Sequence, residues 1–534
     1  MEKKTEMNMA SKRTNLIFVV SMAILLLFQL ALLFFYGNQK AGFHEDELYT
    51  FYSTNKTAGL FVNDRQWTSR EQLYHDLVVL PGEQFRYDVV KQMQSWDVHP
   101  PLYYYMVHTI CSLFPNMFSK WLGIAVNLFA FVGSFVLLAY GAYMASGEKH
   151  GKMIAFLTCL GWGFGSAVIS GVMFIRMYQW LTLFILLCLN LHLRAIKKND
   201  FRIKRFFFPL GITVFLGFLT QYYYIVFHFF LGVGFCFLLL KNKKIKELIT
   251  YVVTCAAGLG LAICYYPACL SHIFRGYRGT EAVSEFGDAS NTLDRLRFFY
   301  GLFDDYVMNG TLSIWLLLIC LCLVTRGYLK KKGKAGNRLM NASTWLMLFS
   351  AMGYFFIISK TALLLGETSN RYQLPVYGIL LFLILYVSWK IAEGFVGNYR
   401  VLAGVFAAVL ILIDGMALKN DKVFFLYREE KEIMEFVDTH ANEPVVVFYN
   451  DASPEHVWWL LDELIRYPKV YLAGEENTAL ITDETITESE KLLVYIAGHE
   501  NQELCLEGIL SANHNLKSYR AVGEKKLWTL YEFS

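Results

Sequence analysis

Residues 15–36, NLIFVVSMAILLLFQLALLFFY, contain no charged side chain. A helix of this length spans a hydrocarbon core about 30 Å thick. Basic residues precede the run, as they do in a signal peptide. However, the run is longer than the apolar part of such a peptide, and no small-residue cleavage site follows it. We therefore expect a first transmembrane helix that is retained in the protein.

Ten further apolar runs, most of them about 18–25 residues long, recur along the chain, and this is the length of a membrane-spanning helix. Charged residues make up only 18% of the 534 residues, whereas about 25% is usual in a soluble domain. The runs cover residues 118–145, 153–173, 177–194, 206–221, 225–240, 248–270, 311–325, 342–359, 375–392 and 400–418. The sequence therefore predicts a polytopic α-helical membrane protein with about eleven transmembrane helices, in a domain that covers residues 1–419.

Lysine and arginine are concentrated in short segments before the first run and between later ones. The clusters are Lys3, Lys4, Lys12 and Arg13; residues 194–205; residues 241–246; and residues 326–338. Loops rich in these residues stay in the cytoplasm, so we expect a cytoplasmic N-terminus in a plasma-membrane protein. Eleven crossings then place the C-terminus and the first long loop, residues 37–116, on the outer face. Because each cluster is a short connector, we expect membrane lipids as partners and no nucleic acid.

Residues 420–534 follow a different pattern, in which short β-branched and aromatic runs alternate with helix-like stretches. The strand-like runs are residues 445–449, 470–472, 492–496 and 528–531. The helix-like stretches are residues 430–441, 455–466 and 501–513. We expect a small α/β domain on the outer face. It has no glycine-rich phosphate loop, and the sequence assigns it no chemistry.

The first candidate site is His44-Glu45-Asp46-Glu47, a few residues beyond the first apolar run. A carboxylate that is partly withdrawn from water has a raised pKa, which suits a general base. Paired carboxylates such as Asp46 and Glu47 can also hold a divalent cation, Mg or Mn. The alternative is an acidic cap on a short helix beside the membrane.

The second candidate is Asp97-Val98-His99-Pro100-Pro101-Leu102, in the same loop. Two consecutive prolines keep the preceding residues out of a helix and make a rigid corner. Asp97 and His99 could orient a substrate beside this corner or tune the acidic cluster. The alternative is a corner with a structural role alone.

The third candidate consists of residues at the outer ends of apolar runs. Arg176 precedes Tyr178, Arg371 precedes Tyr372, and Tyr223 lies in the segment Gln221-Tyr222-Tyr223-Tyr224. A charge at this depth usually has a partner or an anionic ligand, and the planar fork of arginine suits phosphate. The alternatives are arginines that snorkel to lipid headgroups and tyrosines of an interfacial belt. Together, the carboxylates and arginines would suit activation of a hydroxyl nucleophile beside a lipid phosphate leaving group.

These motifs resemble the membrane-embedded glycosyltransferases of the GT-C class, and in particular the superfamily of protein O-mannosyltransferases and lipid A aminoarabinose transferases (glycosyltransferase family 39-like). Its members share an Asp-Glu pair after the first helix, matched here by Asp46-Glu47. They also share a His-Pro-Pro-Leu or Lys-Pro-Pro-Leu element in the same loop, matched here by residues 99–102. The resemblance covers about residues 15–420. It departs from the superfamily at Glu45, directly before the pair, and from the eukaryotic mannosyltransferases after Leu102.

The resemblance implies an inverting transfer of a sugar from a polyprenyl-phosphate donor to the hydroxyl of a lipid, glycan or protein acceptor. Asp46 would be the base or bind the acceptor hydroxyl, and Glu47 would support it. The arginines would hold the lipid phosphate. The predicted substrate-binding residues are Asp97, His99, Arg176, Tyr178, Tyr223, Arg371 and Tyr372.

Two functions of other classes compete with this one. A transporter or flippase of a lipid-linked intermediate would need paired polar residues near the bilayer midplane and interrupted helices in repeated halves, and the sequence shows neither pattern. A scaffold whose outer domain binds cell-wall components is the third hypothesis.

Overall fold

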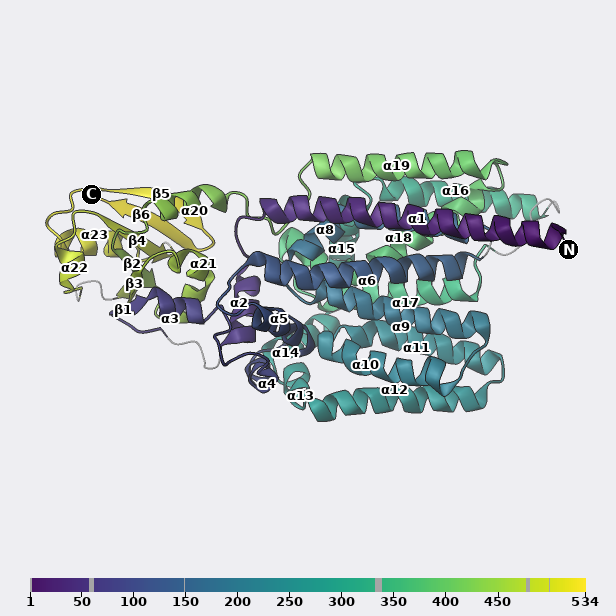
Figure 1. Cartoon of the computed structure of the whole chain (residues 1–534), viewed down its shortest axis with the longest axis horizontal. Helices are drawn as coiled ribbons and strands as arrows, with labels where there is room; N and C mark the ends of the chain where they lie inside the picture. The colour runs from purple at the N-terminus through teal and green to yellow at the C-terminus, as the bar shows by residue number, and fades with distance from the viewer. Residues whose placement is uncertain (1, 57–61, 148, 332–338, 477–480, 499) are drawn as a thin grey trace.

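A computed structural model describes residues 2–56, 62–147, 149–331, 339–476, 481–498 and 500–534. The basic side chains predicted to be cytoplasmic at residues 3–13 and 326–338 lie outside the described part. Figure 1 shows a bundle of long helices with a sheet domain at one end and the N-terminus at the other. We call the end of the bundle beside the sheet domain the sheet-side end; there α1 (Glu2–Gln39) ends and α6 (Lys120–Ser146) begins.

Nine helical segments within the described residues are long and apolar enough to cross a membrane, and two bent pairs bring the number to as many as eleven. The straight helices are α1, α6, α9 (Tyr178–Lys198), α10 (Phe208–Thr220, after the π-turn Ile203–Phe207), α11 (Tyr224–Lys241), α12 (Ile245–Tyr265), α17 (Ala342–Thr361), α18 (Asn370–Ala392) and α19 (Tyr399–Lys419). The predicted polytopic helical fold is thus confirmed.

Two spans are broken, and the apolar runs gave no sign of this. α7 (Gly151–Phe164) and α8 (Ser166–Met173) meet at 57°, and α15 (Thr292–Val307) and α16 (Leu312–Lys331) meet at 97°. The segment between the apolar runs 248–270 and 311–325, residues 271–310, is largely helical. It contains the end of α13 (Ala268–Phe274), then α14 (Tyr277–Gly287) and α15. Hydropathy measures how apolar a segment is and not its direction, so it does not detect such bends.

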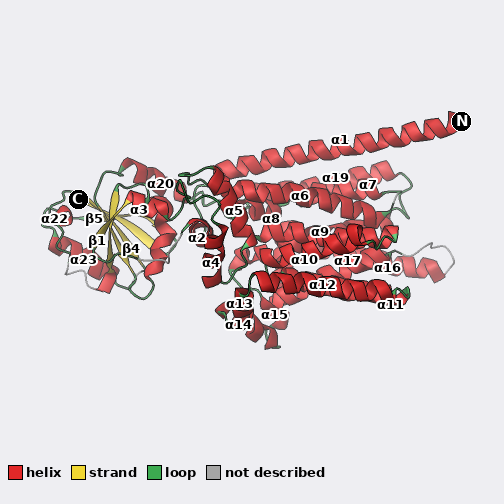
Figure 2. Cartoon of the chain, turned by 60° about the horizontal axis from the view of Figure 1, so that its bottom comes forward, coloured by secondary structure: helices red, strands yellow, loops and turns green. Residues whose placement is uncertain are grey.

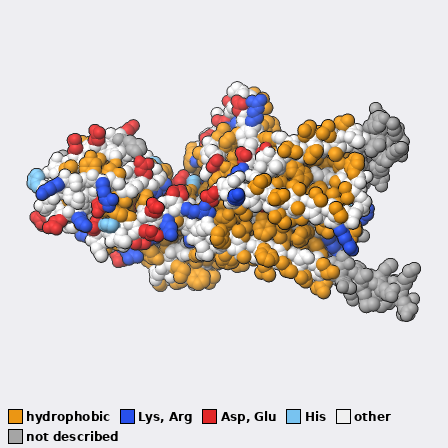
Figure 3. Space-filling model, turned by 90° about the horizontal axis from the view of Figure 1, so that it is seen from above, with side chains coloured by type: hydrophobic (Ala, Val, Ile, Leu, Met, Phe, Trp, Pro, Cys, Tyr) orange, Lys and Arg blue, Asp and Glu red, His pale blue; other side chains and the backbone are white. Residues whose placement is uncertain are grey.

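The surface of the bundle differs from that of the sheet domain. Figure 3 shows hydrophobic side chains over the bundle, whereas charged side chains gather on the sheet domain and where the two meet. Large apolar residues such as Phe28, Phe129 and Phe237 are more than half exposed on the helices. Water would not favour so large an apolar surface, but lipid does. The chain is a multi-pass membrane protein.

Within the described residues, the sheet domain has six strands in the order β1-β3-β2-β4-β6-β5. The strands are β1 (Gln66–Ser69), β2 (Val445–Tyr449), β3 (Lys469–Gly474), β4 (Leu492–Ala497), β5 (Tyr519–Lys525) and β6 (Trp528–Phe533). The three central strands, β3, β2 and β4, are parallel and buried except for Lys469 at the start of β3, as β-branched runs favour, and the outer ones pair antiparallel. Around the strands (Figure 2) lie α20 (Glu430–Thr439), the 3₁₀-helix η3 (Pro454–Leu460), α21 (Leu461–Leu464), α22 (Glu484–Thr487) and α23 (Gln502–Ala512).

The first loop joins the two parts of the molecule. Its strand β1 pairs with β3, so residues assigned by the sequence to the membrane domain complete the sheet of the C-terminal domain. Three of its helices, α2 (Glu45–Asn55), α4 (Tyr87–Trp96) and α5 (Leu102–Leu113), lie at the sheet-side end of the bundle (Figure 1). The fourth, α3 (Arg70–His75), lies on the sheet domain beside β1.

Candidate active site

A cavity of about 1100 Å³ opens at the sheet-side end. Its walls come from α2, the corner at residues 96–99, the turns before α9 and α11, α14, the start of α18, and η3 of the sheet domain. Every predicted site residue except Glu47 lines this cavity. The lining residues are Asp46, Asp97, His99, Arg176, Tyr178, Tyr223, Arg371 and Tyr372. Residues from five distant parts of the sequence therefore meet at one cavity.

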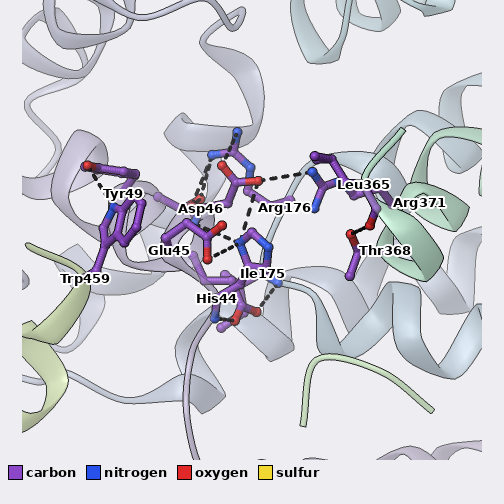
Figure 4. A network of polar contacts seen from close by, with 12 residues as sticks. His44, Glu45, Asp46, Tyr49, Ile175, Arg176, Leu365, Thr368, Arg371 and Trp459 are labelled. Carbon is purple, nitrogen blue, oxygen red and sulfur yellow. Dashed lines mark hydrogen bonds and ion pairs between the residues drawn. The ribbon is translucent and has the colours of Figure 1, made fainter. Parts of the chain in front are cut away.

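Asp46 belongs to the first turn of α2, and its carboxylate lies between the guanidinium groups of Arg176 and Arg371. One carboxylate oxygen is 3.9 Å from Nη2 of Arg176, and the other is 3.6 Å from Nη2 of Arg371. Figure 4 shows the carboxylate between the two guanidinium groups. α2 begins at this point because the backbone N–H of Asp46 donates to Nδ1 of His44, and the N–H of His44 donates to Glu47.

Arg176 is fixed by its neighbours. It sits in the turn between α8 and α9 with a side chain that is 4% exposed. Its Nη1 donates to the hydroxyls of Tyr104 (2.9 Å) and Thr50 (3.1 Å). Its Nη2 lies 3.2 Å from Nε2 of His99. Because arginine only donates, Nε2 must be the acceptor, so Nδ1 carries the proton that His99 shares with Asp97 at 3.0 Å.

Arg371 is buried but keeps donors free. Its Nη2 donates to the hydroxyl of Tyr372 at 3.2 Å, and its guanidinium lies 5.1 Å from the ring centres of Phe174 and Tyr372. Within the described residues, its Nε and Nη1 have no hydrogen-bond partner. An unpaired buried donor costs about 1–3 kcal/mol. These two groups are therefore suited to an anionic ligand in the cavity.

The charges around Asp46 set its protonation state. Burial alone would raise the pKa of its carboxyl, but the positive charges of Arg176 and Arg371 outweigh burial and hold the pKa well below its ordinary value. Burial also lowers the pKa of His44 to about 3, so this imidazole is neutral at neutral pH. Asp46 is thus ionised but neutralised by two cations, which makes it a weak base until another anion shares their charge.

Glu45 differs from its neighbour. It lines the cavity, its side chain is 36% exposed, and it lies 3.2 Å from Nδ1 of His44. Burial raises the pKa of this carboxyl. The three consecutive acids therefore have three environments, and Asp46 alone is paired with the arginines.

Glu47 faces away from the cavity. Its carboxylate is fully buried against Lys40 at 2.8 Å and accepts the backbone N–H of Ile175 at 2.7 Å. Lys40 also donates to the carbonyl of Phe425. Glu47 therefore fastens the turn that carries Arg176 to the helix that carries Asp46. The predicted support of Asp46 by Glu47 can therefore act only through position, because Glu47 does not line the cavity.

The Asp46–Glu47 pair does not fit a divalent cation. The two carboxylates point in different directions, that of Glu47 is saturated by Lys40 and two N–H groups, and that of Asp46 faces two guanidinium groups that would repel a cation. No group of three or more His, Cys, Asp or Glu side chains among the described residues could hold a metal ion. A requirement for Mg or Mn stays an untested prediction.

Several residues at the site are not predicted by the sequence. Tyr104 does not line the cavity but fixes Arg176, and nothing in the sequence distinguishes it from the neighbouring tyrosines. His456 and Trp459 come from the C-terminal domain, which had been assigned no chemistry. Their place depends on how the sheet domain docks on the first loop, and local sequence carries no record of that contact.

No protein-family model matches the sequence, and no curated protein matches it. Solved structures do resemble it in fold. The crystal structure of ArnT from Cupriavidus metallidurans bound to undecaprenyl phosphate matches with a TM-score of 0.56 and 11% identity, over 96% of this chain and 97% of ArnT. The apo state of ArnT matches with a TM-score of 0.48 and 11% identity, over 91% and 96% of the two chains. The first match confirms the expected GT-C-like fold.

Proposed function

We propose that this protein transfers a sugar, with inversion, from a polyprenyl-phosphate donor to an acceptor hydroxyl on the outer face of the membrane. One observation carries the proposal: a carboxylate and two buried arginines with spare donors converge at the sheet-side end of a membrane helix bundle. This arrangement combines a base with a binding site for an anionic leaving group.

In this proposal the lipid phosphate binds beside Asp46, where both Arg176 and Arg371 can reach it. Nε and Nη1 of Arg371 have no hydrogen-bond partner among the described residues, and each of them can form a fork toward phosphate oxygens together with the adjacent Nη2. The fixed positive charges of these buried arginines stabilise the charge that develops on the leaving group. ArnT, whose fold this chain shares, was solved with undecaprenyl phosphate bound, which supports a donor of that class.

The transfer is a single displacement. The acceptor oxygen attacks the anomeric carbon while the bond between that carbon and the phosphate oxygen breaks. The phosphate departs with the bonding electrons as a polyprenyl phosphate, and the hydroxyl proton passes to Asp46. Because the phosphate takes up arginine charge, donor binding raises the basicity of Asp46 at the moment when a base is needed.

The path of the chain supports the proposed topology. α9 and α11 begin beside the cavity, at Tyr178 and Tyr224, and run away from it to Lys198 and Lys241. Their basic ends therefore lie at the same end of the bundle as the N-terminus (Figure 1). By the positive-inside rule this end is cytoplasmic, and the cavity and the C-terminus face outward at the plasma membrane.

The direct test is reconstitution in nanodiscs with undecaprenyl-phosphate-linked hexoses and pentoses and a panel of hydroxyl acceptors (lipids, glycans and a serine- and threonine-containing peptide), followed by mass spectrometry of the released lipid. We expect undecaprenyl phosphate to be formed from at least one donor, with a product of inverted anomeric configuration by NMR. A retained configuration would contradict the single displacement. Failure to consume any donor of this class would contradict the function.

A further inference from the structure

The sheet domain contributes directly to the cavity. His456 and Trp459, both on η3, line it together with Glu45 and Asp46. They are half-buried, and their rings lie 4.1 Å apart between centres at 30°. The result is an aromatic wall, formed by His456 and Trp459, in a cavity whose other walls come mostly from the bundle and the first loop.

The wall is held at a defined position. The indole N–H of Trp459 donates to the hydroxyl of Tyr49 at 3.0 Å, and Lys526 donates to the carbonyl of Trp459 at 2.7 Å. The neighbouring Trp458 donates its own indole N–H to Asp76 in the first loop. η3 is therefore fastened to the first loop on both sides.

The wall lies on one side of Asp46, and Arg371 lies on the other. Tyr49 follows Asp46 by three residues on α2, so both project from the same face of that helix. Figure 4 shows Trp459 and Tyr49 to the left of Asp46, and Arg371 to its right. If the lipid phosphate binds at the arginines, an in-line attack brings the acceptor from the opposite side, where the wall stands.

We propose that His456 and Trp459 form the acceptor site and that the acceptor presents a saccharide ring to them. This inference rests on the proposed function for its direction of attack. A pyranose has a face of C–H groups and a rim of hydroxyls, and the electron-rich face of an aromatic ring attracts the C–H groups. The indole N–H of Trp459 is already used by Tyr49, so Trp459 offers its ring face, and the imidazole of His456 adds a second ring face and polar nitrogens for a hydroxyl of the rim. Glu45, in the same cavity, can accept a hydroxyl of the rim.

Saturation-transfer NMR on the full-length protein in detergent tests this site. The probes are methyl glycosides of common pyranoses, the corresponding disaccharides, and a serine- and threonine-containing hexapeptide. The variant is Trp459→Leu. The matched control is Trp67→Leu, because Trp67 is also half-buried and hydrogen-bonded in the sheet domain, to Asp483, but lies on β1 away from the cavity.

We expect at least one saccharide to bind the wild-type protein and the Trp67→Leu variant equally. Trp459→Leu should weaken that binding about fivefold to tenfold, the loss of one ring contact. Equal binding in wild type and Trp459→Leu, no binding of any saccharide to the wild type, or peptide binding that depends on Trp459 would each overturn the proposal.

A second readout separates this inference from the proposed function. Native mass spectrometry measures how much undecaprenyl phosphate stays bound, and it should not change in Trp459→Leu, because the wall lies away from the arginines. If Trp459→Leu also lost bound undecaprenyl phosphate, this would contradict the separation of the acceptor site at the wall from the lipid site at the arginines. Absence of the lipid from every form would count against the transferase function alone, since the saccharide measurement does not depend on it.

Discussion

The carboxylate of Glu47 accepts the backbone N–H of Ile175 at 2.7 Å and thereby joins the helix that carries Asp46 to the turn that carries Arg176. The same carboxylate is ion-paired with Lys40 at 2.8 Å in a place without exposure to solvent. The distance between the base and the first arginine is therefore set by a residue that does not enter the cavity.

The variant Lys40→Met should destabilise the protein strongly. Loss of one partner leaves the Glu47 charge buried and unpaired, which costs about 3–5 kcal/mol in buried ion pairs. Thermal unfolding in detergent would measure the loss. The control is Lys149→Met, because Lys149 is 76% exposed in its pair with Glu393 and should change stability by less than about 0.5 kcal/mol. Similar unfolding temperatures for both variants would contradict the role given to Glu47.

Arg371→Lys should impair donor binding although the charge is kept. Lysine cannot reproduce the planar fork of a guanidinium group, so we expect the Kd for undecaprenyl phosphate to rise about tenfold or more. Titration with the lipid in nanodiscs would measure this. Arg400→Lys, at an exposed position at the start of α19, is the matched control and should bind as the wild type does. Unchanged affinity in Arg371→Lys would show that the lipid phosphate does not bind at Arg371.

The pH profiles of kcat and kcat/KM should differ. In the free enzyme the arginines hold the pKa of Asp46 well below its ordinary value, so the base stays ionised and kcat/KM for the donor should show no acid limb between about pH 5 and 8. In the donor complex the phosphate shares the arginine charge and the pKa of Asp46 rises. The acid limb of kcat should therefore lie at higher pH than that of kcat/KM. If the acid limbs of kcat and kcat/KM lay at the same pH, the bound phosphate would not share the arginine charge with Asp46.

Chelation should leave transfer unaffected. Arg176 and Arg371 already supply the positive charge at Asp46, and Glu47 is occupied by Lys40. We expect the same initial rate with EDTA in excess as with added Mg or Mn, measured as release of undecaprenyl phosphate. A rate that falls with EDTA and returns with either ion would show that a divalent cation takes part.

The helical fold could be predicted because apolar runs of membrane-spanning length are a property of local sequence. The bend at Gly165 and the strand Gln66–Ser69 could not. Hydropathy does not record direction, and four mostly polar residues become a strand only by pairing with β3, far along the chain.

The candidate site was predictable in part for a similar reason. The charges of Asp46, Arg176 and Arg371 at one end of the apolar runs indicated a shared face. The free donors of Arg371, the burial of Glu47 against Lys40 away from the cavity and the contact between Trp459 and Tyr49 depend on packing between distant segments.

The most direct test of the central claim is Asp46→Asn, assayed for sugar transfer and for lipid binding in the same preparation. The substitution keeps the shape of the side chain but removes its charge, so transfer should fall by about 10²–10⁴-fold. Undecaprenyl phosphate should bind at least as tightly as to the wild type, because the arginines lose their internal anion. Transfer at the wild-type rate by this variant would show that Asp46 is not the base.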